Sequence, residues 1–208
     1  FIIEKIHELN QKNQTEKTII NKLAKGAGIA ALGMFFSKIV SYFFRLAVAR
    51  IGPDAYGQLS LGLTVVGISA IFVTLGLDEA IRKFVPEARA EDDKAKLKGI
   101  VLDSLKIVSA AGLIVGLIVF LSADFIARAA FNSPETAIVI KIFAFVPFFS
   151  KIASVFIDTT IGFNTTKYKV LTVQLLQNLT QLGITLLLIY LSYGVIGAAL
   201  GWLTGVII

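Results

Sequence analysis

Hydrophobic residues occur along the chain in long runs that are separated by short polar segments. A helix rises 1.5 Å per residue, so about 20 apolar residues cross the hydrocarbon core of a bilayer. The runs within 26–208 predict six such spans, at residues 28–49, 57–77, 100–121, 137–157, 170–191 and 195–208. We therefore expect an all-α integral membrane protein, a lobe of six transmembrane helices.

Glycine and proline mark the ends of these spans. A Gly-Pro pair at 52–53 ends the first span, an Asn-Ser-Pro sequence at 132–134 precedes the fourth, and Pro147 interrupts the fourth. Residues 170–208 contain no charge. As one helix this run would be about 58 Å long, roughly twice the hydrocarbon core, so it must turn. The Ser-Tyr-Gly sequence at 192–194 is the predicted turn.

Three polar segments precede or connect the spans, at residues 1–25, 78–98 and 158–169. The first places apolar residues on one helical stripe beside lysines, which predicts a helix at the membrane surface. The second is predicted to be a loop around Pro86 followed by a surface helix, and the third a polar loop. Together they hold 13 of the 20 Lys and Arg, whereas the opposite flanks hold two. This bias places the three segments and the N-terminus in the cytoplasm.

The composition narrows the function. The chain has 208 residues, of which 56% are hydrophobic and 16% charged, against about 25% charged in soluble domains. It has no cysteine and one histidine, His7, so neither a Ser-His-Asp triad nor a site of several histidines can form. No GxxxxGK[ST] phosphate loop occurs. We expect binding or transport without a cofactor or metal, and assign the net charge of +6 to membrane topology rather than to nucleic acid.

Cationic side chains within the spans are the first candidates for a binding site, because each costs on the order of 2.5–3.5 kcal/mol at the bilayer centre. Lys38 and Arg45 are seven residues apart and project within about 20° of each other. This stripe ends near Arg50. Lys151, beyond the kink at Pro147, is a further candidate for lining a cavity. The alternative for Arg45 is that it extends to the membrane surface.

Amide side chains form the second candidate set, on the fifth span. They are Gln174, Gln177, Asn178 and Gln181. Their spacing of i, i+3, i+4 and i+7 puts them on one helical face. Residues of this kind commonly hydrogen-bond one helix to another. We favour a polar wall that binds sugar hydroxyls or water, because four amides exceed what one helix contact needs.

Other features of the spans predict structural roles. The pattern Gly-xxx-Gly at residues 112–116 and 197–205 is typical of faces at which helices pack closely. Asp103 and Lys106 are three residues apart and are expected to form an ion pair. Lys141 lies close to the outer surface and is expected to reach it.

Two stretches carry a resemblance to a known family: RIGPDAYGQLS at 50–60 and LGLDEAIRKF at 75–84. GVIGAALG at 194–201 adds a weaker likeness. With these motifs, residues 22–208 resemble the start of polysaccharide-transporter flippases of the multidrug/oligosaccharidyl-lipid/polysaccharide (MOP) exporter superfamily. The resemblance implies two lobes of six helices around a central cavity. This chain would be the N-terminal lobe, without the C-terminal lobe.

The resemblance further implies translocation of a lipid-linked oligosaccharide across the cytoplasmic membrane of a prokaryote by alternating access. The implied partners are that substrate, membrane lipids and the C-terminal lobe. The cationic stripe would then attract a polyprenyl phosphate head group, and the amide face would bind glycan. A drug/cation antiporter of the same superfamily is the alternative, for which buried carboxylates are expected. A non-transporting membrane scaffold is a third hypothesis, and it needs no polar cavity.

Overall fold

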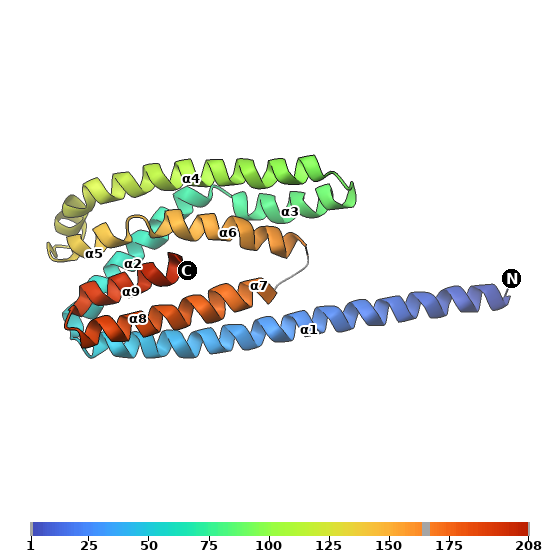
Figure 1. The fold of residues 1–208 in the computed structure, drawn as a ribbon, viewed down its shortest axis with the longest axis horizontal. Coiled ribbons are helices and arrows are strands. Elements are labelled where there is room, and N and C mark those ends of the chain that lie inside the picture. The colour runs from blue at the N-terminus through green and yellow to red at the C-terminus, as the bar shows by residue number, and fades with distance from the viewer. Residues whose placement is uncertain (1, 164–166, 208) are drawn as a thin grey trace.

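The computed structural model describes the backbone of residues 2–163 and 167–207, with side chains placed at residue 24, at 26–163 and at 168–207. In these residues every regular element is a helix (Figure 1). In chain order they are α1 (Ile2–Ala49), α2 (Pro53–Thr74), α3 (Leu77–Ala90), α4 (Lys94–Phe125), η1 (Ile126–Ala130), α5 (Thr136–Phe143), α6 (Val146–Gly162), α7 (Lys167–Lys169), η2 (Val170–Gln177), α8 (Asn178–Tyr190) and α9 (Gly194–Ile207). The elements η1 and η2 are π-helices.

Five of the predicted spans correspond to segments long and apolar enough to cross a membrane. They are Gly26–Ala49, Pro53–Thr74, Lys94–Ala130, Thr136–Gly162 and Val170–Tyr190. The sixth, Gly194–Ile207, is apolar but shorter. The third span is longer than expected, because α4 begins at Lys94 and continues into η1. The all-α membrane fold predicted from the sequence is confirmed.

The turns between the spans lie at the glycine and proline residues that predicted them. Gly52 has a φ of 147°, which side chains rarely tolerate, and Pro53 begins α2. Ser192 and Gly194, with φ values of 65° and 53°, form the turn between α8 and α9. The break before Pro147 separates α5 from α6.

The polar segment at 78–98 differs from the prediction. It begins with a helix, α3, and Pro86 lies inside that helix rather than in a loop. The buried residues of α3 are Ile81, Val85 and Ala88. They are three or four residues apart and form one apolar face against α4 and α6. The stabilisation that comes from burying this face exceeds the cost of the backbone hydrogen bond that Pro86 cannot make. Similarly, α6 continues to Gly162, so Asp158 lies in a helix rather than in a loop.

The helix ends separate into two groups, as Figure 1 shows. The start of α1, the α3–α4 turn, the end of α6 and the start of α7 lie at one end of the bundle. The α1–α2 turn, the link from η1 to α5 and the α8–α9 turn lie at the other. The three lysine- and arginine-rich segments therefore share one end. That this end is cytoplasmic stays a prediction.

Helix α1 continues from the arm into the first span without interruption. It comprises 48 residues, Ile2–Ala49, and is therefore about 72 Å long. The backbone has no break at residue 25, which differs from a separate helix lying on the membrane surface. Figure 1 shows α1 extending beyond the other helices at its N-terminal end. The side chains of residues 1–23 lie outside the described ones, so the apolar stripe in the arm stays a prediction.

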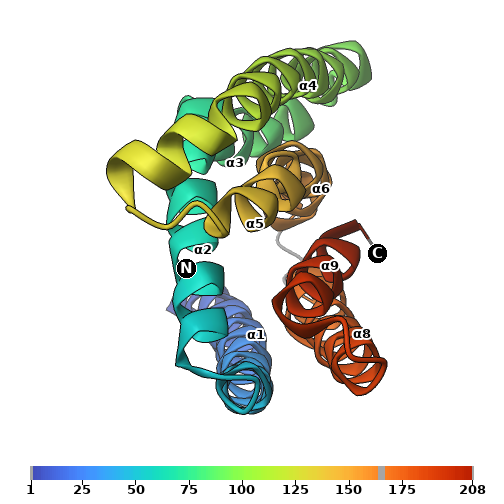
Figure 2. The ribbon, with the colours of Figure 1, turned by 90° about the vertical axis from the view of Figure 1, so that its left-hand side faces the viewer.

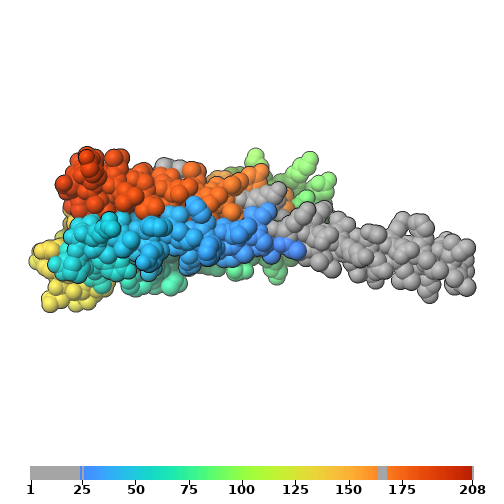
Figure 3. All heavy atoms as spheres, turned by 90° about the horizontal axis from the view of Figure 1, so that it is seen from below, coloured from blue at the N-terminus to red at the C-terminus, as the bar shows by residue number. Residues whose placement is uncertain are grey.

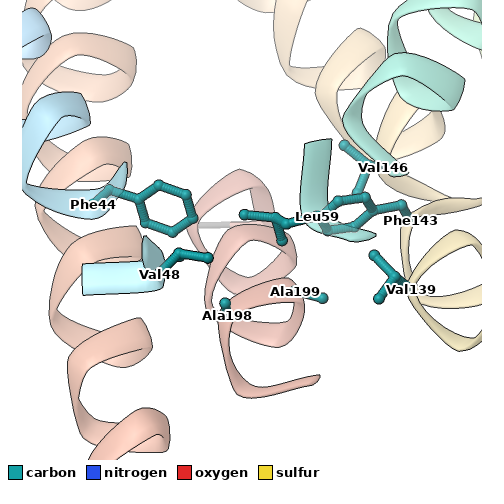
Figure 4. Close-up of a cluster of buried hydrophobic side chains, with 8 residues drawn as sticks. All are labelled: Phe44, Val48, Leu59, Val139, Phe143, Val146, Ala198 and Ala199. Atoms are coloured by element: carbon teal, nitrogen blue, oxygen red, sulfur yellow. The ribbon is translucent and has the colours of Figure 1, made fainter. Parts of the chain in front are cut away.

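The core joins helices from both ends of the chain (Figure 4). Its main cluster comprises Phe44, Val48, Leu59, Val139, Phe143, Val146, Ala198 and Ala199. These residues come from α1, α2, α5, α6 and α9. A second cluster lies among α2, α4, η1 and α5, and a third attaches α3 to α2, α4 and α6. The main cluster holds α1 and α2 against α9, which is where a pocket lies.

The predicted small-residue faces are confirmed as packing surfaces. Gly112 and Gly116 of α4 lie against Phe148 and Phe145. On α9, a Cβ at Gly201 would overlap Thr185 of α8, and one at Gly205 would come within 2.8 Å of the Gln181 side chain. The absence of side chains at these positions lets α8 and α9 approach closely.

We expect Gly201→Ala to lower the stability of the protein by about 1–3 kcal/mol, because the added methyl group overpacks the α8–α9 contact. Thermal unfolding in detergent, followed by circular dichroism, measures this loss. Gly183→Ala is the matched control, since a Cβ at Gly183 meets nothing within 4 Å. Equal unfolding temperatures for the two variants would contradict the packing role.

Candidate functional site

A pocket of about 360 Å³ lies between α1, α2 and α9, within the range of about 300–1,000 Å³ typical of ligand sites. Helices α1 and α2 diverge from the turn that joins them, as Figure 2 shows. The residues that line the pocket are Ser41, Phe44, Arg45, Tyr56, Leu59, Ser60, Leu63, Thr64 and Trp202. The pocket thus lies within the spans and combines apolar with polar side chains.

The apolar part of the pocket is packed firmly. The rings of Phe44 and Trp202 meet edge to face with 5.4 Å between centroids, and Phe143 lies 6.5 Å from Trp202 on the same measure. Phe44 is 3% exposed. Leu59, equally buried, approaches from α2. A wall held in this way fixes the positions of the polar groups beside it.

Arg45 is the one charged residue among the described side chains that line the pocket. It is exposed, and no acidic partner is found for it in the described part of the chain. The hydroxyls of Ser60 and Thr64 donate to the backbone carbonyls of Tyr56 (2.8 Å) and Ser60 (2.9 Å), so their oxygens remain free to accept hydrogen bonds. The pocket can therefore bind an anionic group through Arg45 and hydroxyl groups through α2.

Lys38 lies beside this pocket rather than in it. Lys38 and Arg45 are both exposed, and their spacing puts them on one side of α1. Ser41, between them, lines the pocket, but Lys38 does not. Lys38 thus adds positive charge near the pocket and is placed to act on a ligand that extends past Ser41.

Arg50 directly follows α1, continues its hydrogen-bond pattern to Leu46, and lies on a different side of the helix from Arg45. Five residues separate it from Arg45, which corresponds to about 140° around a helix. Arg50 lines a groove between α1 and α8, together with Leu182 and Leu186. The stripe that was expected to continue from Lys38 and Arg45 to Arg50 is therefore divided between two faces.

Lys151 is held in an ion pair and does not join Arg45. Its Nζ lies 3.0 Å from Oδ2 of Asp78, and the two side chains are only 18% and 26% exposed. The pair lies in a shallow pocket with Thr74 of α2. We therefore assign Lys151 to the contact between α6 and the start of α3.

A second ion pair between α3 and α6 was missed by sequence reasoning. The guanidinium of Arg82 donates to Oδ1 of Asp158 from Nε (2.9 Å) and Nη2 (2.8 Å), and the Asp158 side chain is 4% exposed. The hydrogen bond to Asp158 raises the pKa of Arg82 above its usual value, against the opposing effect of burial. Arg82 and Asp78 are four residues apart, so both ion pairs use one face of α3.

The amide face lies in helix contacts. Asn178 Nδ2 donates to Oγ of Ser37 on α1 (3.1 Å) and to backbone carbonyls of η2. Gln174 lies against Gly33 of α1, and its Oε1 is buried without a hydrogen-bond partner among the described residues. Gln181 is 6% exposed against α9.

The remaining amide residue, Gln177, places its backbone carbonyl against Gly205 of α9. These contacts favour helix packing over a polar wall. The two predicted constellations, cationic and amide, thus do not meet in one site.

Two other predicted contacts can be placed. Lys106 pairs with Asp103 at 2.9 Å, as expected. Lys141 pairs with Asp124 at 2.6 Å instead of extending alone to the surface.

Sequence reasoning also did not identify the hydroxyl-bearing residues of α2 that line the pocket. Tyr56, Ser60 and Thr64 are spaced by four residues and therefore lie on one face of α2. This spacing within a span otherwise free of charge was the available signal. Trp202 gave no signal, because its role depends on the contact between α9 and α1.

The long apolar helices define a protein of the multi-pass membrane class, with a pocket between three of its helices that contains one cation and several hydroxyl groups. A family model described as "Polysaccharide biosynthesis protein" matches residues 23–208. The chain belongs to this family, the polysaccharide transporter family of the MOP superfamily, and its size fits the N-terminal half of such a protein. No match was found among curated proteins or among solved structures.

Proposed function

We propose that this chain is the N-terminal lobe of a flippase that moves an anionic, polyprenyl-linked oligosaccharide or polysaccharide precursor across the cytoplasmic membrane by alternating access. The observation that supports this function most directly is the pocket at Arg45. It offers one unpaired cation and two hydroxyl acceptors beside an apolar wall. A lipid-linked sugar presents the complementary groups, namely phosphate, sugar hydroxyls and an apolar chain.

In this proposal each part of the pocket has one task. Arg45 binds the phosphate or pyrophosphate, and Lys38 increases the local positive potential. Ser60 and Thr64 accept hydrogen bonds from the glycan, a role we had first expected of the amide face. The polyprenyl chain stays in the bilayer. A C-terminal lobe completes the pathway, and the N-terminus is cytoplasmic.

A drug/cation antiporter is less consistent with the pocket. Binding of a cation within a membrane protein calls for a carboxylate, and no acidic side chain occurs among the described residues that line the pocket. A scaffold that does not transport a ligand would give no functional reason for an unpaired arginine in a membrane-spanning helix.

Ligand titration of the full-length protein in nanodiscs tests the proposal. One series uses a polyprenyl-pyrophosphate sugar and the other a lipophilic cation, each at low and high salt. We expect the anionic lipid alone to bind, with an affinity that falls as salt increases, because the contact is between charges. Binding of the cation alone would reject the flippase in favour of the antiporter.

A further inference from the structure

The groove that contains Arg50 differs in character from the pocket at Arg45. It lies between α1 and α8, with a volume of about 420 Å³. Its lining residues are Phe43, Leu46, Ala47, Arg50, Leu182, Leu186 and Ile189. Six of these seven are apolar, and Arg50 is the single charge. Figure 3 shows the face of the molecule on which α1 and α8 lie side by side.

The position of Arg50 in this groove follows from the helix boundaries. Arg50 comes directly after the last residue of α1, at the end of the first span. The other lining residues of α1 lie three to seven positions earlier, within the span. The groove therefore has a cationic mouth at the end of the span and an apolar body beside the hydrocarbon layer.

Two tyrosines place this mouth at the level of the lipid head groups. Tyr190 and Tyr193 flank the α8–α9 turn, at the same end of the bundle as Arg50, and are 85% and 55% exposed. Exposed tyrosines at helix ends are typical of the boundary between membrane and water. No acidic partner for Arg50 is found in the part of the chain that the structure describes.

We propose that the groove binds a phosphate-bearing membrane lipid, with its phosphate on Arg50 and one acyl chain between α1 and α8. The polarity of the groove matches such a lipid from head to tail. The site is about 140° around α1 from Arg45, so its occupant and a ligand in the pocket do not compete for the same surface. The inference therefore does not depend on the proposed transport function.

Photolabelling of the full-length protein in nanodiscs tests this site. The probe is phosphatidylglycerol with a diazirine in one acyl chain, and mass spectrometry locates the labelled residues. We expect labels on Leu46, Leu182 and Leu186. Arg50→Gln should reduce this labelling about five-fold, through the loss of one cation near the membrane surface. Leu186→Trp should reduce it at least as much by filling the groove.

Matched variants separate the groove from general contact with lipid. Leu187→Trp adds the same side chain at the neighbouring position of α8, which is 57% exposed and outside the groove. Arg128→Gln removes an exposed cation of η1 at the same end of the bundle. We expect both to be labelled like the unmodified protein. Equal loss in the groove and control variants would overturn the inference.

Two further arms identify the occupant. A diacylglycerol with the same diazirine lacks the phosphate and should label the groove weakly. Equal labelling by it would overturn the role of Arg50. Unlabelled phosphatidylglycerol should compete with the probe. Competition by polyprenyl pyrophosphate alone would reject a membrane lipid and assign the groove to the chain of a transport substrate. Binding of the polyprenyl-pyrophosphate sugar in the pocket is measured in a separate experiment. A failure of the lipid-site proposal can therefore be distinguished from a failure of the proposed transport function.

Discussion

Arg45→Gln is expected to weaken the binding of a polyprenyl-pyrophosphate sugar to the full-length protein by about 10- to 100-fold. The estimate corresponds to the loss of one charge-assisted hydrogen bond. Lys38→Gln is expected to weaken it only about five-fold, because Lys38 lies beside the pocket and acts through solvent-screened attraction. The double variant Lys38→Ala/Arg45→Ala should lose head-group binding and transport while remaining folded. Titration at two salt concentrations measures all three effects.

Arg128→Gln provides the control for this comparison, since it removes an exposed cation of η1 and does not alter the residues that line the pocket. Its affinity and its salt dependence should equal those of the unmodified protein. Undiminished transport by the double variant would remove the pocket from the mechanism. A larger effect of Lys38 than of Arg45 would show that the head group lies outside the pocket.

Arg82→Gln is expected to destabilise the protein by about 2–3 kcal/mol. Removing one partner of a buried ion pair typically costs about 3–5 kcal/mol, because the other charge is left unpaired. Here Asp158 is buried, but the Arg82 side chain is 37% exposed and partly screened by water. Thermal unfolding in detergent, followed by circular dichroism, should show the loss as a lower midpoint.

Lys83→Gln is the matched control, because Lys83 is exposed on the same helix and contacts only the Phe84 ring among the interactions described. The double variant Arg82→Leu/Asp158→Leu should recover much of the lost stability, since replacing both charges leaves neither unpaired. Additive losses in the double variant would contradict a direct ion pair.

The pH dependence of this contact also has a definite sign. The pKa of Arg82 is raised by its hydrogen bond to Asp158. A raised pKa on a base contributes stability that is fully present below the unfolded-state pKa and is lost only as the pH rises through the folded-state pKa. For arginine, the pKa of the unfolded state and that of the folded state both lie far above pH 7. The stability difference between the unmodified protein and Arg82→Gln should therefore be constant from pH 6 to pH 9.

The spans and turns could be predicted because they depend on neighbouring residues. The Gly-Pro pair ends the first span whatever contacts the helix makes with other parts of the chain. An uncharged run of 39 residues must turn, because it is longer than the thickness of a bilayer. The close packing of α9 was predictable for the same reason, since glycines four residues apart leave one face of a helix without side chains.

The partners of polar residues could not be predicted, because they come from distant parts of the chain. The spacing of the amides fixed their common face. It did not indicate that Asn178 meets Ser37, 141 residues away. Arg82 and Asp158 are 76 residues apart, and only the fold brings α3 to α6. The prediction that Arg50 ends the stripe of Lys38 and Arg45 did not allow for the helical rotation between the residues. Five residues turn a helix by about 140°, so Arg50 lies on a different side from Arg45.

The length of α1 has a mechanical consequence. Helix α1 is packed against η2, α8 and the core from Gly33 onwards, so its residues 2–32 form an arm of about 46 Å, and a tilt of 10° moves the free end of this arm by about 8 Å. Arg45 lies in the packed part of α1, where Phe44 and Val48 are buried in the core. A rotation of α1 too small to disturb its core contacts would thus become a large displacement at the far end of the arm. A small tilt of α1 at the pocket would therefore be detected most easily as a displacement of the arm.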